Sequence, residues 1–465
     1  MAGRSLDRLV TAGALLAALV LFVDPALAHV GSLGGTLTSV PIPFWLVVVT
    51  GGGIIGASFM FTSFATDHDL IRSINRRGIT VPSPATVRRG VVALARVGSV
   101  GVLGLFVVTG LFAPQLEATD PTKNLAVLGV WAGWWAGYTI SVYLVGDTWP
   151  VLNPWRAIAS VLPRVGSRSW SGDLGGWPAA VGLLALVWLE VVTPIASDPQ
   201  FLAVVILAYT LGTLAGAVVF GDEWFREVDP VSRVFHTYGR MAPVRRTDEG
   251  IRLSLPGAAL ARSYDEGTEA EVVFVVALLW VTSYDGLVAT APHADLVRAA
   301  VGLGVPALVV YLATAIAGFA LFLAVYRLAA RLSRRSAGSF VDPAVIQRRF
   351  VWSLVPIAAG YHLAHFLGYF LTLSPALSAV ALSPLDPPAT VQVAVLPGWF
   401  GSVQLALVVL GHLVAIWVAH AIAFETFTGK LQPIRSQYPF ALVMVFYTMT
   451  SMWLVAQPYV PPPYL

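Results

Sequence analysis

Four histidines lie inside two consecutive apolar segments near the C-terminus of this 465-residue chain: His362, His365, His412 and His420. Ionisable side chains are costly to place at membrane depth. Where they occur, they mark a proton path, a metal or cofactor site, or a buried structural bond. These histidines are therefore the first candidates for chemistry in the sequence.

The spacing of the histidines predicts a geometry. The two apolar segments run in opposite directions, and His362 and His412 each lie near a segment midpoint. His365 is one helical turn from His362, about 4.5 Å further out, and shares its face. We therefore expect His362, His365 and His412 to converge on one ion or cofactor. His420, about 12 Å further inward than His412, is expected near the inner surface.

Carboxylates at similar depth extend this candidate site. Glu190, in another outward-running segment, is expected at nearly the depth of His365, and Asp285 ends a further segment. Either could accept a proton, and Glu190 could complete a shell of three histidines and one carboxylate. These ligand types suit a divalent transition metal such as Zn, Cu or Fe, and the absence of cysteine excludes thiolate ligands. Histidines that merely hydrogen-bond across helices are the open alternative, each bond contributing about 0.6 kcal/mol.

The N-terminus has the pattern of an export signal. Arg4 and Arg8 precede a short apolar run, and a small-x-small cleavage site ends at Ala28. Residues 1–28 are therefore expected to be a cleavable signal peptide, with an uncleaved anchor helix as the alternative. Cleavage would leave His29 first, where its α-amine and imidazole together could chelate a metal such as copper.

The composition predicts the elements that position these residues. The chain is 57% hydrophobic and only 11% charged, with a mean hydropathy of +0.76, whereas soluble domains carry about 25% charged residues. We predict an all-α, polytopic transmembrane bundle that forms one integral membrane domain over 29–465. About ten segments are long enough to cross a bilayer: 43–64, 91–112, 125–145, 177–196, 201–220, 272–291, 299–325, 350–373, 399–424 and 438–456.

Basic residues predict the orientation of the bundle. Arginines concentrate in every second loop, whereas the opposite loops hold little more than Lys123 and Arg298. Because basic residues accumulate in cytoplasmic loops, we expect a multi-pass protein of the cell membrane with both mature termini outside. The expected partner is the lipid bilayer, with no nucleic acid and no protein partner indicated. The longest polar stretch, 221–271, is short for a catalytic domain, and the Pro-rich stretch 374–397 is expected to be a loop.

A repeated Gly-Asp-x-Trp motif is the second feature. One copy contains Asp147 and Trp149, the other Asp222 and Trp224, and an Asx-Pro pair follows each. The repeat predicts an internal duplication around 125–196 and 201–291. Interfacial tryptophans and helix caps explain the same residues structurally. A substrate-binding role would require Asp147 and Asp222 to face a shared cavity.

Several short motifs are spread over most of the chain. They are Ala28-His29-Val30-Gly31, Gly146-Asp147 through Asn153-Pro154-Trp155-Arg156-Ala157-Ile158, Ser283-Tyr284-Asp285-Gly286, Tyr361-His362 with His365, Gly411-His412 with His420, and Arg435-Ser436-Gln437-Tyr438-Pro439. Together they resemble a family of polytopic prokaryotic membrane proteins labelled fenitrothion hydrolase. The resemblance implies hydrolysis of an organophosphate triester, a small apolar substrate, and assigns no residue a role.

A mechanism follows as a hypothesis. A metal held by His362, His365 and His412 would lower the pKa of bound water and supply hydroxide for attack on phosphorus. Glu190 or Asp285 would take up the proton. The alternatives are a His-ligated haem or copper redox protein, a transporter of a metal or small solute, and a membrane subunit whose histidines only pack.

Overall fold

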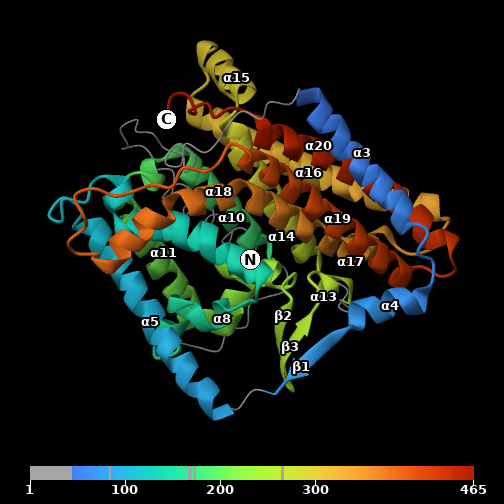
Figure 1. Ribbon diagram of the computed structural model, residues 1–465, viewed down its shortest axis with the longest axis horizontal. Helices are drawn as coiled ribbons and strands as arrows, with labels where there is room; N and C mark the ends of the chain where they lie inside the picture. Colours follow the sequence, from blue (N-terminus) through green and yellow to red (C-terminus); the bar gives the residue numbers. More distant parts are fainter. Residues whose placement is uncertain (1–43, 83–84, 166–169, 171–173, 263–266) are drawn as a thin grey trace, which may run out of the picture.

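The computed structural model describes residues 44–82, 85–165, 170, 174–262 and 267–465. These residues form a bundle of tilted helices with a small sheet at one end and helix α15 at the other (Figure 1). We call these ends the sheet end and the α15 end. The expected signal peptide, 1–28, and His29 lie outside the described residues.

The bounds of the helices and strands, in chain order, are as follows. The first half contains α3 (Phe44–Thr62), α4 (His68–Arg76), β1 (Gly78–Val81), α5 (Ala85–Leu111), η1 (Pro121–Lys123), α6 (Leu125–Leu128), the π-helix η2 (Gly129–Tyr138), α7 (Thr139–Leu144), α8 (Trp149–Leu152), α9 (Pro154–Ala159), α10 (Trp177–Val192), η3 (Pro194–Ala196), α11 (Pro199–Phe220) and the π-helix η4 (Trp224–Val228). The second half contains α12 (Pro230–Gly239), β2 (Val244–Thr247), β3 (Gly250–Ser254), α13 (Ala258–Ala261), α14 (Glu269–Val288), α15 (Ala291–Gly302), α16 (Ala307–Ala337), α17 (Pro343–Phe350), η5 (Val351–Leu354), α18 (Val355–Leu382), α19 (Phe400–Thr426) and α20 (Leu431–Ala456).

Long apolar helices dominate the described part of the chain. Eight of them are long and apolar enough to cross a membrane. Two shorter apolar helices, Val48–Thr62 and Trp177–Val192, fall on the first and fourth expected segments. The prediction of a helical membrane protein is confirmed, since such helices bury their backbone polar groups internally and can face lipid. The number of crossings and their orientation stay predictions.

Two boundaries differ from the sequence-based ranges. The segment expected at 299–325 is divided, because α15 ends at Gly302 and α16 begins only at Ala307. Gly304, with φ +90°, makes a turn that residues with side chains rarely adopt. The stretch expected as a loop from residue 374 is helical as far as Leu382, with Pro375 inside α18.

A three-stranded antiparallel sheet, in the order β1-β3-β2, lies at the sheet end (Figure 1). Arg252 of β3 pairs with Thr80 of β1 and Arg245 of β2. The Val244 amide donates to the Val145 carbonyl at 3.0 Å, which ties the sheet to the end of α7. The polar stretch 221–271 is therefore packed against the bundle, although its sequence shows no clear core pattern.

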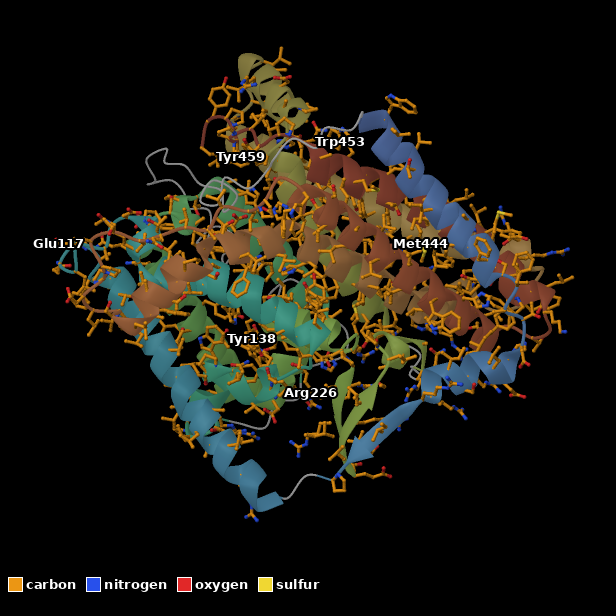
Figure 2. The ribbon with its side chains drawn as sticks, in the orientation of Figure 1. Glu117, Tyr138, Arg226, Met444, Trp453 and Tyr459 are labelled. Atoms are coloured by element: carbon orange, nitrogen blue, oxygen red, sulfur yellow. The ribbon has the colours of Figure 1, made fainter. Side chains whose placement is uncertain are left out.

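The side chains differ between the two ends of the molecule. Figure 2 shows Arg226 toward the sheet end, whereas Trp453 and Tyr459 lie toward the α15 end. Between the ends, no residue of α5 from Arg89 to Val108 is buried, whereas almost every residue of α14 is buried. Helix α14 is therefore central in the bundle, and α5 is positioned to face lipid.

Helices α18 and α19 cross at two glycines. A Cβ atom at Gly411 would lie 2.6 Å from the Pro356 carbonyl oxygen and 2.8 Å from the Gly360 Cα. Such contacts are shorter than real Cβ atoms make, so the close crossing requires glycine at this point. The crossing fixes the two helices that carry the four histidines.

Candidate functional site

A line of polar side chains, buried except for the half-buried His365, runs along one face of α18. It consists of Tyr361, His365, Tyr369 and Thr372, whose spacing of four, four and three places them on the same side of a helix. We call this set the α18 stripe. The hydroxyls of Tyr361, Tyr369 and Thr372 are buried without a hydrogen-bond partner among the described residues. Buried polar atoms normally have such partners, so the stripe is suited to bind water or a polar ligand.

Within the stripe, His365 contacts a carboxylate of α14. Its Nε2 lies 3.3 Å from Oδ2 of Asp285, and the two side chains are 21% and 12% exposed. The ring of Tyr361 lies parallel to that of His365, with centroids 6.0 Å apart. The Tyr361 hydroxyl reaches Gly286, where a Cβ atom would lie only 2.2 Å from it. His365 and Asp285, which the sequence analysis proposed for different roles, are thus in direct contact.

The second candidate carboxylate, Glu190, borders the same region from α10. It is buried, with 8% of its surface exposed. It interacts electrostatically with Tyr284, next to Asp285, and with Tyr369 of the α18 stripe. Two acidic side chains from different helices therefore adjoin the stripe.

His362 faces a different set of neighbours from His365. Its Nδ1 lies 3.2 Å from the Tyr143 hydroxyl, and its ring also interacts with the backbone of Trp135. The rings of Trp135 and Tyr238 also pack against it, each with centroids 5.9 Å away. Trp135 belongs to η2, and π-helical segments occur frequently at functional sites.

The two histidines of α19 do not join this group. His412 Nδ1 donates to the Val408 carbonyl at 2.9 Å, within its own helix. His420 Nε2 donates to the Ala65 carbonyl at 2.8 Å, and its Nδ1 lies 3.3 Å from the Gln437 side chain. Both partners of His420 lie outside α19, so His420 connects α19 to the rest of the bundle.

The expected metal shell is not assembled. Among the residues that the structure describes, no group of three or more His, Cys, Asp or Glu side chains is arranged to hold a metal ion. The rings of His362, His365 and His412 each turn to a different partner: Tyr143, Asp285 and Val408. The helices that carry these histidines could be predicted from the sequence, but the direction of each ring could not.

The Gly-Asp-x-Trp motifs are built into helix junctions. Asp147 Oδ1 accepts the Trp149 amide at 3.0 Å, and burial raises the pKa of Asp147 to about 6. Asp222 is largely exposed and lies 3.6 Å from Arg156 Nε. Trp224 packs against Gly216, where its ring fills the place of a Cβ atom. The two aspartates therefore make different local contacts, Asp147 with the Trp149 amide and Asp222 with Arg156.

Ser232 joins the segments that follow the two motifs. Its hydroxyl accepts hydrogen bonds from Trp149 Nε1 at 3.1 Å and Asn153 Nδ2 at 3.0 Å, and it donates to Asp229. Asn153 and Asp229 also cap α9 and α12, each ahead of a proline at the first helical position. These contacts support the structural reading of the repeat. Ser232 itself was not singled out from the sequence, because nothing in its local pattern distinguishes it.

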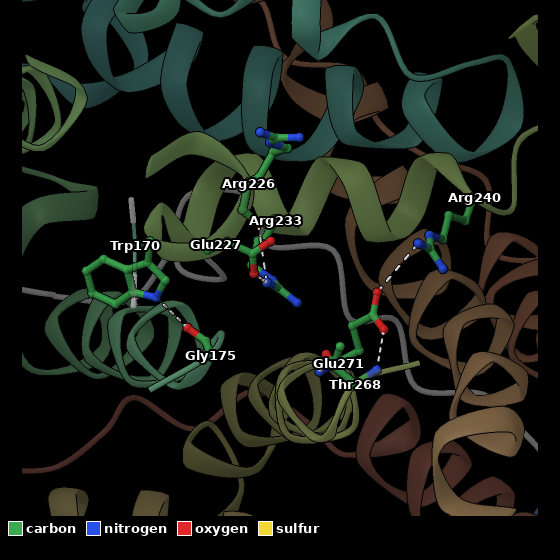
Figure 3. A network of polar contacts seen from close by, with 8 residues as sticks. All are labelled: Trp170, Gly175, Arg226, Glu227, Arg233, Arg240, Thr268 and Glu271. Carbon is green, nitrogen blue, oxygen red and sulfur yellow. Dashed lines mark hydrogen bonds and ion pairs between the residues drawn. The ribbon is translucent and has the colours of Figure 1, made fainter. Parts of the chain in front are cut away.

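Ion pairs hold the sheet end together. Arg233 Nη1 lies 2.9 Å from Glu227, and Arg240 Nη2 lies 3.5 Å from Glu271; Figure 3 shows both pairs. Glu271 also accepts the Thr268 amide at 2.7 Å in a capping box that begins α14. The start of the helix that carries Asp285 is therefore fixed.

Comparisons with protein-family models, curated proteins and solved structures find no match for this chain.

Proposed function

We propose that this membrane protein is a proton-coupled transporter of a small solute, in which His365 and Asp285 share the exchangeable proton. The 3.3 Å contact between these two side chains carries the proposal. Ionisable residues within membrane-spanning helices are rare, and they mark proton relays and substrate paths. Because the pair connects α14 to α18, its protonation would alter a contact between two long apolar helices.

The coupling follows from charge. With Asp285 ionised and His365 protonated, the two side chains attract one another in a medium that screens charge poorly. A proton added to the carboxylate removes that attraction and favours separation of the helices. Release of that proton from Asp285 restores the attraction and with it the contact between α14 and α18. A two-state interhelical contact of this kind is what proton-coupled alternating access requires.

The α18 stripe supports a path to the pair. From His365, Tyr369 and Thr372 continue toward the C-terminal end of α18, and Glu190 adjoins Tyr369. The unpartnered hydroxyls of Tyr369 and Thr372 offer hydrogen bonds to water or to a polar solute. The π-helix η2, packed against His362, adds an irregular backbone segment next to the same helix.

Hydrolysis of an organophosphate triester, which the resemblance suggests, is the second candidate. The observation that favours it is the same contact, because a carboxylate that orients an imidazole is the usual support of a general base. His365 would take a proton from water while the resulting hydroxide attacks phosphorus and an aryloxide leaves. Asp285 would stabilise the imidazolium.

Charge movement in reconstituted membranes tests the transporter. The full chain in liposomes is adsorbed on a solid-supported membrane, and an acid pulse is applied with protons as the only probe. Wild-type protein should give a transient current as protons enter the membrane field, and Asp285→Asn should abolish it. Asp295→Asn is the matched control, since Asp295 is an exposed carboxylate paired with Arg298 on α15. A current that persists in Asp285→Asn contradicts the proposal.

The second candidate has its own readout. Release of nitrophenol from fenitrothion, measured by absorbance with the same preparations, should require both His365 and Asp285 if the pair acts as a general base. Turnover without acid-induced current would select hydrolysis, and current without turnover would select transport.

A further inference from the structure

A cavity of about 110 Å³ opens at the sheet end of the bundle. It lies where α4, α13, the end of α17 and the end of α19 come together (Figure 1). Its charged lining residues are four arginines and one carboxylate: Arg72, Arg76, Arg262, Arg349 and Glu425. None of the residues that line the cavity belongs to the α18 stripe, so the cavity is a separate feature.

Arg262 distinguishes this cavity from an ordinary surface ion pair. Arg72 is satisfied by Glu425, with Nε and Nη2 at 2.9 and 3.3 Å from its two oxygens. By contrast, the Nε and Nη2 of Arg262 are buried and have no hydrogen-bond partner in the part of the chain that the structure describes. Burial, and repulsion from Arg252 among others, lowers the pKa of the Arg262 guanidinium. Unsatisfied buried donors and like-charge repulsion both cost free energy that a bound anion would offset.

We propose that this cavity binds the phosphate group of an anionic ligand. The planar guanidinium matches phosphate oxygens in paired, charge-assisted hydrogen bonds. The volume suffices for one phosphate group. The phosphate can come from an anionic lipid headgroup or from the free anion.

The surroundings of the cavity suit the lipid source. Helix α4 is amphipathic, with Leu70 exposed and Asn75 buried against Trp417. Strand β1 follows it and exposes Ile79 and Val81. Exposed apolar side chains beside basic residues are typical of segments at a membrane surface, and basic pockets between helices at that level accept lipid headgroups.

Ligand-dependent thermal stability tests the proposal. The purified full chain in phosphatidylcholine-containing micelles is titrated either with phosphatidylglycerol or with inorganic phosphate. Wild-type protein should gain in melting temperature. In Arg262→Gln, the ligand concentration for half the gain should rise about tenfold or more, since a charge-assisted hydrogen bond is lost. Arg246→Gln is the control, because Arg246 is an exposed arginine of β2 that does not line the cavity.

The outcomes distinguish the two sources of phosphate. A lipid-headgroup site is supported if phosphatidylglycerol raises the melting temperature of wild-type protein and of Arg246→Gln but not that of Arg262→Gln. The same pattern with inorganic phosphate alone supports a site for the free anion. The proposal is overturned if neither ligand raises the melting temperature of wild-type protein. It is also overturned if the ligand raises the melting temperature of Arg262→Gln as much as that of wild-type protein. Should Arg262→Gln fail to fold, Arg76→Gln, which also lines the cavity, takes its place with the same criteria.

Discussion

The crossing of α18 and α19 gives a prediction that can be worked from distances. In Gly411→Ala, the new Cβ atom would lie 2.6 Å from the Pro356 carbonyl oxygen and 2.8 Å from the Gly360 Cα. An ordinary contact is about 3.5 Å, so the helices would have to separate by about 0.9 Å. Both neighbours are backbone atoms, which no side-chain rotation can move. Overpacking of this kind costs about 1–3 kcal/mol.

Gly101→Ala is the matched control for this substitution. Gly101 lies in α5, and a Cβ atom there meets nothing within 4 Å. Alanine should therefore be neutral or stabilise α5 by up to about 1 kcal/mol. The free energy of unfolding, measured by SDS titration in mixed micelles, should be lower for Gly411→Ala than for Gly101→Ala by about 1–4 kcal/mol. Equal stability of the two variants would refute the close crossing.

Three further predictions concern other parts of the molecule. Because burial raises the pKa of Asp147 from 3.8 to about 6, the free energy of unfolding of wild-type protein relative to that of Asp147→Asn should fall by about 3 kcal/mol or less as pH rises from 4 to 6. The lowered pKa of the neighbouring His236 acts in the opposite direction in both proteins, and identical pH profiles of unfolding for the two proteins would contradict the assignment. Ser232→Ala should destabilise by about 1–3 kcal/mol in SDS titration, because Trp149 and Asn153 lose their acceptor, whereas the exposed Ser160→Ala should change little. His420→Ala should lower the melting temperature, since the Ala65 carbonyl loses its donor, but leave the acid-induced current intact; loss of that current would give His420 a functional role.

Helix type could be predicted from this sequence. The apolar segments and their approximate bounds follow from composition and length. His362, expected at a helix midpoint, lies instead in the first third of α18, because that helix continues to Leu382. The sequence also placed Asp285 near the C-terminal end of its helix, as the structure does. These properties depend only on distance along a helix axis, which rises by about 1.5 Å per residue.

Rotation about the helix axis could not be predicted. His412 turns back onto Val408 of its own helix, and His365 turns toward Asp285. Which face of α18 meets α14 depends on packing between helices, including the crossing at Gly360 and Gly411. That packing is a property of the assembled bundle rather than of either segment alone.

Two residues of the α18 stripe were missed for a different reason. Tyr369 and Thr372 carry no charge at neutral pH, whereas the candidates that the sequence offered for this helix were histidines. Their signal was nevertheless present, because they continue the spacing of Tyr361 and His365 on one helical face. A search for polar residues with helical periodicity would have found them.

Infrared difference spectroscopy tests the shared proton most directly. Spectra of the reconstituted full chain are recorded at high and low pH, and the carboxylic C=O band that appears on acidification is assigned by substitution. Our account predicts that Asp285→Asn removes a band that Asp295→Asn leaves unchanged, and that His365→Gln shifts the pH at which this band appears. A spectrum of Asp285→Asn identical to that of wild-type protein would contradict it.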